Sequence, residues 1–311
     1  MNIAAIVVTY NRKQLLIECI QAILKQSLKV GEIIIIDNNS NDGTYEALQQ
    51  NKLLNLENIK YKKLDENIGG AGGFYEGFKE SKKYNPDWLW IMDDDTIPNE
   101  DCLEKLLLAK SEIKEDISFL ASSVYGINGE YMNVPTIDLT PTKNGYSDWY
   151  KYLNKKMVKI ESATFVSILI NYKAVKRVGL PCKQYFLWGD DTEYTLRLTK
   201  YYGEAYLVGD SVAIHKRKNA KALTIIEENE KNRINIYFYM IRNNLINAKE
   251  YKGKKRVLQI LLNNFKNLII IPFKKGCKYK MLKIKVIFKG IISFVFRRYD
   301  YKDFRNRMIY E

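Results

Sequence analysis

Short apolar runs alternate with helically spaced apolar positions along the first 110 residues. The runs Ile3–Val8, Glu32–Asp37 and Trp88–Met92 are apolar through their centres, which is typical of strands buried on both faces of a parallel sheet. A more exposed strand is expected at Ile59–Leu64. Helical spacing lies between the strands, over 13–28, 43–50, 74–83 and 99–110. This alternation predicts an α/β fold with a mostly parallel, Rossmann-like sheet flanked by helices.

The second half of the sequence is less regular. The expected elements are strands at Phe119–Tyr125, Ala163–Ile170 and Ala205–His215 and helices at Asp190–Tyr202 and 227–250. After residue 250, apolar and basic residues interleave over many turns, as in amphipathic helices. We therefore predict an α/β domain over residues 1–225 and a helical, basic region over residues 226–311.

The formal charge of +14 is concentrated at one end of the sequence. Of the 50 Lys and Arg residues and the 36 Asp and Glu residues, 18 basic and 4 acidic ones lie in 249–311, so residues 1–248 are neutral overall. A neutral body with a basic, amphipathic segment indicates contact with a membrane surface through 249–311. One alternative is a packed helical subdomain with a solvated basic face. Nucleic acid is a poorer partner, because the body is neutral and no RNA-binding motif is present.

Targeting features and cysteine spacing bear on the compartment. No apolar stretch approaches the roughly 20 residues of a spanning helix, and the first residues lack the basic leader of a signal peptide. The four cysteines, Cys19, Cys102, Cys182 and Cys277, form no CxxC pair, which argues against a zinc site and a disulfide framework. We therefore expect a peripheral protein on the cytoplasmic face of the cell membrane, with reduced thiols.

Three consecutive carboxylates, Asp93, Asp94 and Asp95, directly follow a predicted buried strand. Adjacent carboxylates repel one another, and a divalent cation removes that repulsion; hard oxygen ligands suit Mg²⁺ or Mn²⁺. His215, the only histidine, ends another predicted strand and could complete such a site. A solvated acidic turn and a structural histidine are the alternatives. The topology favours the metal site, because ligands of parallel sheets bind at the carboxyl ends of the strands.

Asp190 and Asp191 lie at the entrance of a predicted helix, where a carboxylate can act as general base toward a hydroxyl nucleophile. The alternative is a helix cap with favourable dipole charges. Tyr185 and Trp188 offer flat faces for stacking on a sugar ring, although core packing explains Trp188 equally well. Glycines in the segment Asn67–Gly73 allow close backbone approach to a ligand, but their spacing does not match the dinucleotide-binding fingerprint.

Together these segments resemble glycosyltransferase family 2, whose members have the GT-A fold. The family's opening nucleotide-binding unit is similar to VVTYNRKQLLIECIQAILKQSL and EIIIIDNNSNDGT, its DxD motif to WLWIMDDD, and its acceptor-helix motif to GDDTEYTLRL. The resemblance covers about residues 1–220. Within the family, ENIGGAGGF and WGDDTEY resemble galactofuranosyltransferases, and rhamnosyltransferases share much of this pattern. Galactofuranosyl enzymes carry Trp directly before the two acids, where this chain has Gly189.

The resemblance implies a role for each matching residue. Asp93, Asp95 and His215 would bind Mn²⁺ or Mg²⁺. Asp191 would be the catalytic base, with Asp190 beside it contacting the acceptor. The residues implied at the nucleotide-sugar donor are Thr9, Arg12, Asp37, Asn67, Gly70 and Asp94, and those implied at the acceptor are Trp188 and Glu193.

The implied reaction is a single displacement that inverts the anomeric centre. Its expected substrates are UDP-galactofuranose and a lipid-linked glycan of bacterial cell-surface polysaccharide synthesis. The alternatives are a rhamnosyltransferase using dTDP-rhamnose and a non-catalytic nucleotide-sugar-binding protein. A nucleotidyltransferase with a similar sheet would leave GDDTEY without a role. A homo-oligomer is compatible with the sequence.

Overall fold

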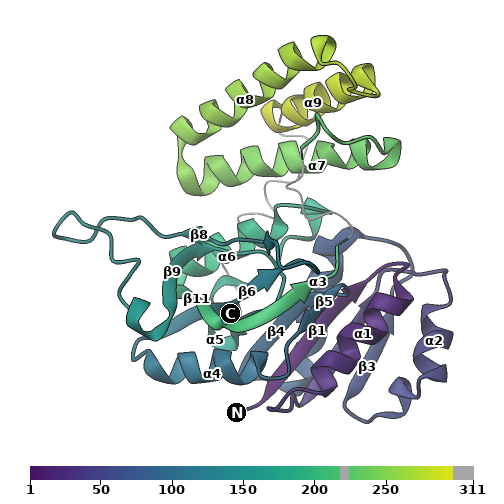
Figure 1. Ribbon diagram of the computed structural model, residues 1–311, viewed down its shortest axis with the longest axis vertical. Helices are drawn as coiled ribbons and strands as arrows, with labels where there is room; N and C mark the ends of the chain where they lie inside the picture. The colour runs from purple at the N-terminus through teal and green to yellow at the C-terminus, as the bar shows by residue number, and fades with distance from the viewer. Residues whose placement is uncertain (218–223, 297–311) are drawn as a thin grey trace.

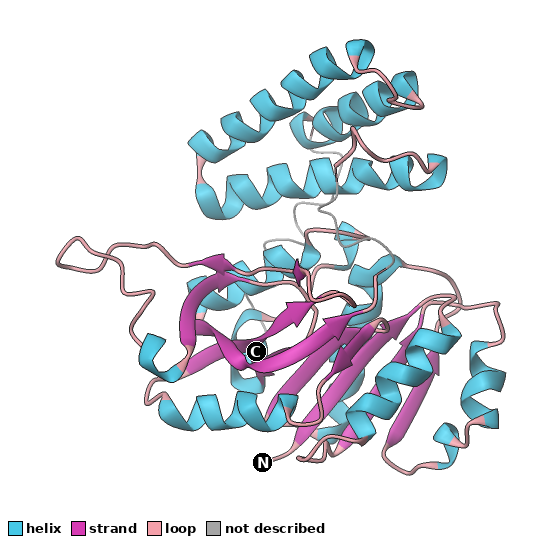
Figure 2. Ribbon diagram, viewed as in Figure 1, coloured by secondary structure: helices cyan, strands magenta, loops and turns pink. Residues whose placement is uncertain are grey.

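The computed structural model describes residues 1–217 and 224–296. The described chain forms a layered α/β part that ends with β11, and three helices, α7 to α9, stacked beyond it (Figure 1). Figure 2 shows helices on both faces of a central sheet, so the predicted α/β architecture is confirmed.

The strands are β1 (Ile3–Thr9), β2 (Glu32–Asp37), β3 (Ile59–Lys63), β4 (Trp88–Asp93), β5 (Thr96–Pro98), β6 (Ile117–Tyr125), β7 (Tyr131–Met132), β8 (Thr136–Ile137), β9 (Met157–Ser162), β10 (Ile168–Asn171) and β11 (Glu204–His215). The helices are α1 (Lys13–Leu24), α2 (Thr44–Gln50), α3 (Gly69–Ser81), α4 (Cys102–Glu112), α5 (Tyr172–Val178), α6 (Asp190–Tyr201), α7 (Lys231–Asn247), α8 (Lys254–Phe273) and α9 (Lys280–Val295).

The sheet has two halves of different character. Its strand order is β3-β2-β1-β4-β10-β6-β11-β9-β8, and the first four strands are mutually parallel. β10 is antiparallel to both of its neighbours, whereas β11 runs parallel to β6. The carboxyl ends of β1, β2 and β4 therefore meet at one edge, as the sequence predicted for its polar clusters.

Alternating side chains of the parallel strands enter two separate cores. Ala5 and Val7 pack with α1 and α4 on one face, while Ala4 and Ile6 pack with α3, α5 and α6 on the other. Burial on both faces explains why these strands are continuously apolar. Gly77 lets α3 lie close to β1, because a Cβ at this position would stand 2.5 Å from Cγ2 of Ile6.

Some predicted boundaries were wrong for local reasons. The helix expected over 13–28 ends at Leu24, and the buried side chain of Gln26 then donates to the carbonyl oxygens of Ala22 and Asn99. The strand expected from Ala163 begins only at Ile168, because Ser167 has a left-handed φ of 55°. Short strands such as β5 were not predicted, since three residues carry too little periodicity.

The three last helices share a core of their own, which includes Ile234, Ile241, Ile271 and Ile287. α9 packs closely on α7 at Gly290, where a Cβ would stand 2.9 Å from Cβ of Ile241. Among the described residues, no helix combines the length and the apolarity needed to cross a membrane. The domain boundary at 225/226 stays a prediction, and residues 297–311 of the predicted basic region lie outside the described residues.

Candidate active site

The parallel register brings the first polar cluster against the acidic triplet. Val8 of β1 pairs with Asp93 of β4, so Thr9 lies beside the following aspartate. Its hydroxyl donates to Oδ2 of Asp94 at 2.7 Å, and both residues are buried. The predicted proximity of Thr9 and Asp94 is therefore observed.

Arg12 extends from the turn after β1 to two of the three aspartates. Its Nη1 lies 3.2 Å from Oδ1 of Asp94 and 2.7 Å from Oδ2 of Asp95. Burial disfavours the charged guanidinium, but the neighbouring carboxylates outweigh it and raise the pKa of Arg12. The side chain of Arg12 remains 49% exposed, so a ligand can reach it.

Asp93, Asp95 and His215 form a group that could hold a metal ion. One ligand atom from each lies within 4.8 Å of the others. β5 and β11 create this proximity, since their antiparallel pairing sets His215 opposite Thr96, next to the triplet. Nε2 of His215 stands 3.0 Å from Oδ1 of Asp95.

Asn133, a residue that no sequence pattern predicted, determines which nitrogen of the His215 ring carries the proton. Nδ1 of His215 lies 2.8 Å from Oδ1 of Asn133, an amide oxygen that can only accept, so Nδ1 carries a proton. In the neutral ring, the lone pair of Nε2 then faces Oδ1 of Asp95; in the protonated ring, Nε2 donates to that oxygen, which is the contact that lowers the pKa of Asp95. Two facing acceptors at 3.0 Å require a proton or a metal ion between them, and a divalent cation fits this donor set.

Burial and mutual repulsion raise the pKa values of Asp93 and Asp94, whereas the pKa of Asp95 is lowered. Burial, followed by the charges of Asp95 and Asp94, raises the pKa of Asp93 well above its usual range. The pKa of Asp94 rises to about 6, mainly through burial, although Arg12 opposes the shift. Burial also acts on Asp95, but contact with His215 and the charge of Arg12 outweigh it and lower its pKa. The triplet therefore holds excess negative charge in need of a cation.

The second carboxylate pair, Asp190 and Asp191, opens α6. Burial, with the charge of Asp191 next, raises the pKa of Asp190 to about 8. Burial also raises the pKa of Asp191, but two donors of Thr192 contact its Oδ1, the amide at 2.6 Å and the hydroxyl at 3.2 Å, and favour the charged form. The charge of Asp190 contributes, as the smallest of several causes, to the raised pKa of Asp93.

Side chains of α7 hold the turn that precedes Asp190. Phe186, Trp188 and Gly189 all have positive φ, a conformation that is strained for Phe and Trp. Nδ2 of Asn243 donates to the carbonyl oxygens of Tyr185, Leu187 and Trp188, and Nδ2 of Asn247 to that of Gly189.

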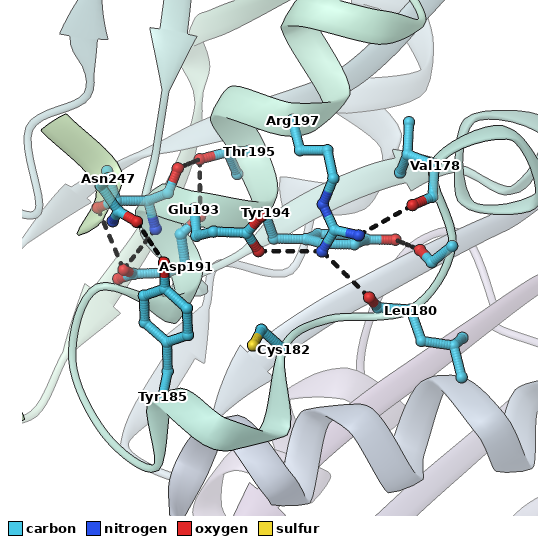
Figure 3. Close-up of polar contacts among 12 residues, drawn as sticks. Val178, Leu180, Cys182, Tyr185, Asp191, Glu193, Tyr194, Thr195, Arg197 and Asn247 are labelled. Atoms are coloured by element: carbon cyan, nitrogen blue, oxygen red, sulfur yellow. Dashed lines mark hydrogen bonds and ion pairs between the residues drawn. The ribbon is translucent and has the colours of Figure 1, made fainter. Parts of the chain in front are cut away.

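Two further contacts complete this restraint. The hydroxyl of Tyr185 donates to Oδ1 of Asn247 (Figure 3), and Nη2 of Arg242 donates to the carbonyl oxygen of Gln184. We call Arg242, Asn243 and Asn247 the α7 clamp. The sequence showed a helix rich in Asn, Tyr and Arg here, but not what these side chains would contact.

Glu193, a predicted acceptor residue, is enclosed by other side chains of the protein. Its Oε2 lies 2.9 Å from Nη2 of Arg197, and its Oε1 accepts from the hydroxyl of Tyr251 at 2.8 Å. The residue is 1% exposed, and Arg197 also donates to the carbonyl oxygens of Val178 and Leu180 (Figure 3). Both carboxylate oxygens of Glu193 are engaged inside the protein, where the residue braces α6, and its acceptor contact stays a prediction.

The glycine-rich segment Asn67–Gly73 packs against the turn that precedes α6. A Cβ on Gly69 would stand 2.0 Å from the carbonyl oxygen of Phe186, and the amide of Ala71 donates to that same oxygen at 3.1 Å. The side chain of Asn67 accepts from the amide of Gly69 at 2.9 Å. Gly70 faces the side chain of Leu187. This segment thus supports the turn before α6, and the donor contacts of Asn67 and Gly70 stay predictions.

Two further predicted residues are partly engaged within the chain. Asp37, at the carboxyl end of β2, is buried and accepts from the amide of Ser40 and the hydroxyl of Tyr61. Trp188 packs its ring edge-on against Tyr237 of α7, with ring centroids 5.2 Å apart. Asp37 thus lies at the same sheet edge as the triplet, and Trp188 lies in the turn before Asp190.

A parallel βαβ sheet, a metal-capable acidic triplet after β4 and a carboxylate pair at a helix entrance define the GT-A glycosyltransferase class. The family model described as Glycosyl transferase family 2 matches residues 4–179. The chain therefore belongs to glycosyltransferase family 2. The match includes the triplet and ends before Asp190, Asp191 and His215.

Individual proteins agree with this assignment. The galactofuranosyltransferase GlfT1 of Mycolicibacterium smegmatis is 24% identical over 208 residues, 64% of this chain and 65% of that protein. GlfT1 of Mycobacterium tuberculosis is 23% identical over 206 residues, with the same coverage of 64% and 65%. The chain thus spans about 65% of the length of these curated relatives.

Solved structures share the fold at low identity. TarS 1–349 of S. aureus, in complex with UDP, has a TM-score of 0.57 and 15% identity, covering 86% of this chain and 72% of that one. GalNAc-T7, solved with UDP, GalNAc and Mn²⁺, has a TM-score of 0.61 and 14% identity, covering 96% and 58%. These likenesses show the GT-A fold.

Proposed function

We propose that this chain is a metal-dependent, inverting glycosyltransferase that moves a sugar from a nucleotide-sugar donor to a lipid-linked glycan of bacterial cell-surface polysaccharide. The observation that carries the proposal is the group formed by Asp93, Asp95 and His215, which could hold a metal ion at the carboxyl end of β4. Family membership and the fold support it. The relatives named galactofuranosyltransferase favour galactofuranose from UDP-galactofuranose as the donor sugar.

Asp93, Asp95 and His215 would hold Mn²⁺ or Mg²⁺, with Asn133 orienting the imidazole. A divalent cation there would offset the negative charge that develops on a departing nucleoside diphosphate. Thr9 and Arg12 hold Asp94 in place on the donor side. The half-exposed guanidinium of Arg12 also gives the site a cation of its own for phosphate oxygens.

Asp191 is the proposed catalytic base. Burial and the charge of Asp191 raise the pKa of Asp190, which favours its protonated form. The two donors of Thr192 favour the ionised form of Asp191. Asp191 therefore takes the proton from the acceptor hydroxyl as that oxygen forms its bond to the anomeric carbon. The bond to the diphosphate breaks on the opposite side, which inverts the centre.

Donor hydrolysis by the purified full chain tests this proposal. UDP-galactofuranose, dTDP-rhamnose, UDP-galactose and UDP-glucose are each incubated with Mn²⁺, with Mg²⁺, and with EDTA as a control. We expect metal-dependent release of nucleoside diphosphate, fastest from UDP-galactofuranose. Preference for dTDP-rhamnose would reassign the donor. Calorimetric titration of each donor would follow if none is hydrolysed, and binding without any transfer to a lipid-linked acceptor would indicate a non-catalytic binding protein.

A further inference from the structure

α8 and α9 each present a stripe of large apolar side chains to solvent. On α8 the exposed residues are spaced by three or four positions, so they share one helix face: Leu258, Leu262, Phe265, Ile269 and Phe273. On α9 the exposed residues are spaced by seven, four and three positions, which again keeps them on one face: Met281, Phe288, Ile292 and Val295. We call these residues the apolar stripes. Ile269 is 69% exposed and Phe273 83%, values that are unusual for large apolar residues on successive turns.

The apolar stripes are not the faces that fold the helices together. The side of α8 that packs against its neighbours carries Val257, Leu261, Leu268 and Ile271. α8 and α9 therefore each have two apolar faces: one packs in the helical core, and the other is not covered by any described residue. In Figure 1 both helices lie beyond α7, away from the sheet.

The charge around the apolar stripes has one sign. Residues 251–296 contain 12 Lys and Arg residues and neither Asp nor Glu. Lys255 and Lys266 on α8 and Lys285 and Lys289 on α9 are exposed. Such a surface attracts a sheet of negative charge and repels an identical copy of itself.

We propose that the apolar stripes and the lysines beside them dock the protein on an anionic phospholipid bilayer, with α8 and α9 lying in the interface. An apolar face flanked by lysines is the pattern of interfacial helices, and no described helix is suited to cross the bilayer. A second copy would bring two strongly basic faces together. Nucleic acid would leave the aliphatic side chains without partners. The inference builds on the proposed function, because docking would hold the site near a lipid-linked acceptor.

The test is binding of the full chain to vesicles of phosphatidylcholine alone or with phosphatidylglycerol. The variant carries Leu262→Glu and Ile269→Glu together. The matched control is Leu108→Glu on α4, since Leu108 is 52% exposed and Leu262 58%. We expect the wild type and the control to bind vesicles containing phosphatidylglycerol, and the double variant to bind at least tenfold more weakly. Added salt should weaken wild-type binding.

Several results would overturn the docking surface. One is that the wild type does not bind the anionic vesicles. Another is that the double variant binds them as tightly as the wild type. A third is that light scattering shows the wild type to be a dimer and that the only effect of the double substitution is to dissociate it. A double variant that loses binding to RNA but not to vesicles would do the same. Donor hydrolysis is measured on the same samples. Vesicle binding without donor hydrolysis and without transfer to a lipid-linked acceptor would refute the proposed function and leave the docking surface standing. Hydrolysis or transfer without vesicle binding would do the opposite.

Discussion

The side-chain nitrogen of Asn243 lies 2.6 Å from the carbonyl oxygen of Trp188, in the turn that leads into Asp190. This contact joins a helix of the C-terminal region to the entrance of α6, where the proposed base lies. Together with Asn247 and Arg242, it provides hydrogen bonds for a turn with three positive φ angles. The α7 clamp therefore restrains the backbone of the turn that leads into the carboxylates of α6.

Replacing Asn243 with alanine should lower kcat for sugar transfer about tenfold or more and leave the donor KM nearly unchanged. The change leaves up to three carbonyl oxygens without their donor, which should cost about 1–3 kcal/mol of unfolding free energy. Initial rates and thermal unfolding measure the two effects. Asn235→Ala, at an exposed position of the same helix, is the control. A normal kcat in a destabilised Asn243→Ala protein would restrict the clamp to a role in stability.

Asn133 should control metal affinity through the tautomer of His215. Asn133→Ala removes the oxygen that accepts from Nδ1 and should raise the Mn²⁺ dissociation constant by about 10–100-fold. Asn133→Asp keeps an acceptor and tolerates the left-handed φ of 49°, so it should bind Mn²⁺ at least as tightly as the wild type. Calorimetric titration of Mn²⁺ measures both. Equal weakening in the two variants would contradict the tautomer argument.

Asp191→Asn should reduce sugar transfer by about 10²–10⁴-fold, because the amide cannot take the acceptor proton. Donor affinity should change little, since Asp191 is not among the residues proposed to bind the donor. Transfer rates and donor titration by calorimetry test both statements. Asp210→Asn, at an exposed aspartate that pairs with Lys156, serves as control. Retained turnover in Asp191→Asn would remove this residue as base.

Asp190 should make the metal-free protein less stable as pH rises. Its pKa is raised from 3.8 to about 8, so the folded chain holds the proton more tightly than the unfolded chain. The stability this provides is complete below about pH 4 and is lost as pH rises through 8. Asp190→Asn should therefore stabilise the protein at pH 8 by on the order of 1–3 kcal/mol and have little effect at pH 4. Chemical unfolding at both pH values measures this, and a pH-independent difference would contradict it.

Glu193→Gln should destabilise the protein by about 3–5 kcal/mol, because it leaves the charge of Arg197 buried without a partner. Denaturant unfolding measures the loss. Glu227→Gln, at an exposed glutamate, is the control. If Glu193 instead contacts the acceptor, the substitution would raise the acceptor KM while the unfolding midpoint stays unchanged.

The parallel half of the fold was predictable because its apolar runs and the polar residues that follow them are features of short, continuous stretches of sequence. Continuous apolar runs mark strands buried on two faces, and the polar residues that follow them, such as Thr9 and Asp93, must share the carboxyl edge. The antiparallel half was harder. β5, β7 and β8 have only three, two and two residues, and β5 pairs with β11, which lies far away in the sequence. His215 could be named in advance, but its approach to Asp95 depends on the unpredicted β5.

The residues that the sequence did not reveal act through other residues. Asn133 lies in a loop with no motif and acts through His215. The side-chain nitrogen of Asn243 donates to backbone carbonyl oxygens, which carry no sequence signature. For Glu193, the sequence suggested a functional role, whereas the structure shows a structural one. Its place after two aspartates suggested chemistry, but the i, i+4 spacing to Arg197 already allowed a helix-internal ion pair.

The α7 clamp has a consequence for how this enzyme can be rebuilt. A chimera joined at residue 225 would give the transferase part a foreign helix in place of α7, and so replace the side chains that hold Tyr185 to Gly189. Recombination within the family should therefore succeed more often when the turn before α6 and α7 come from the same parent. The helical region and the turn before α6 should therefore be exchanged as one unit.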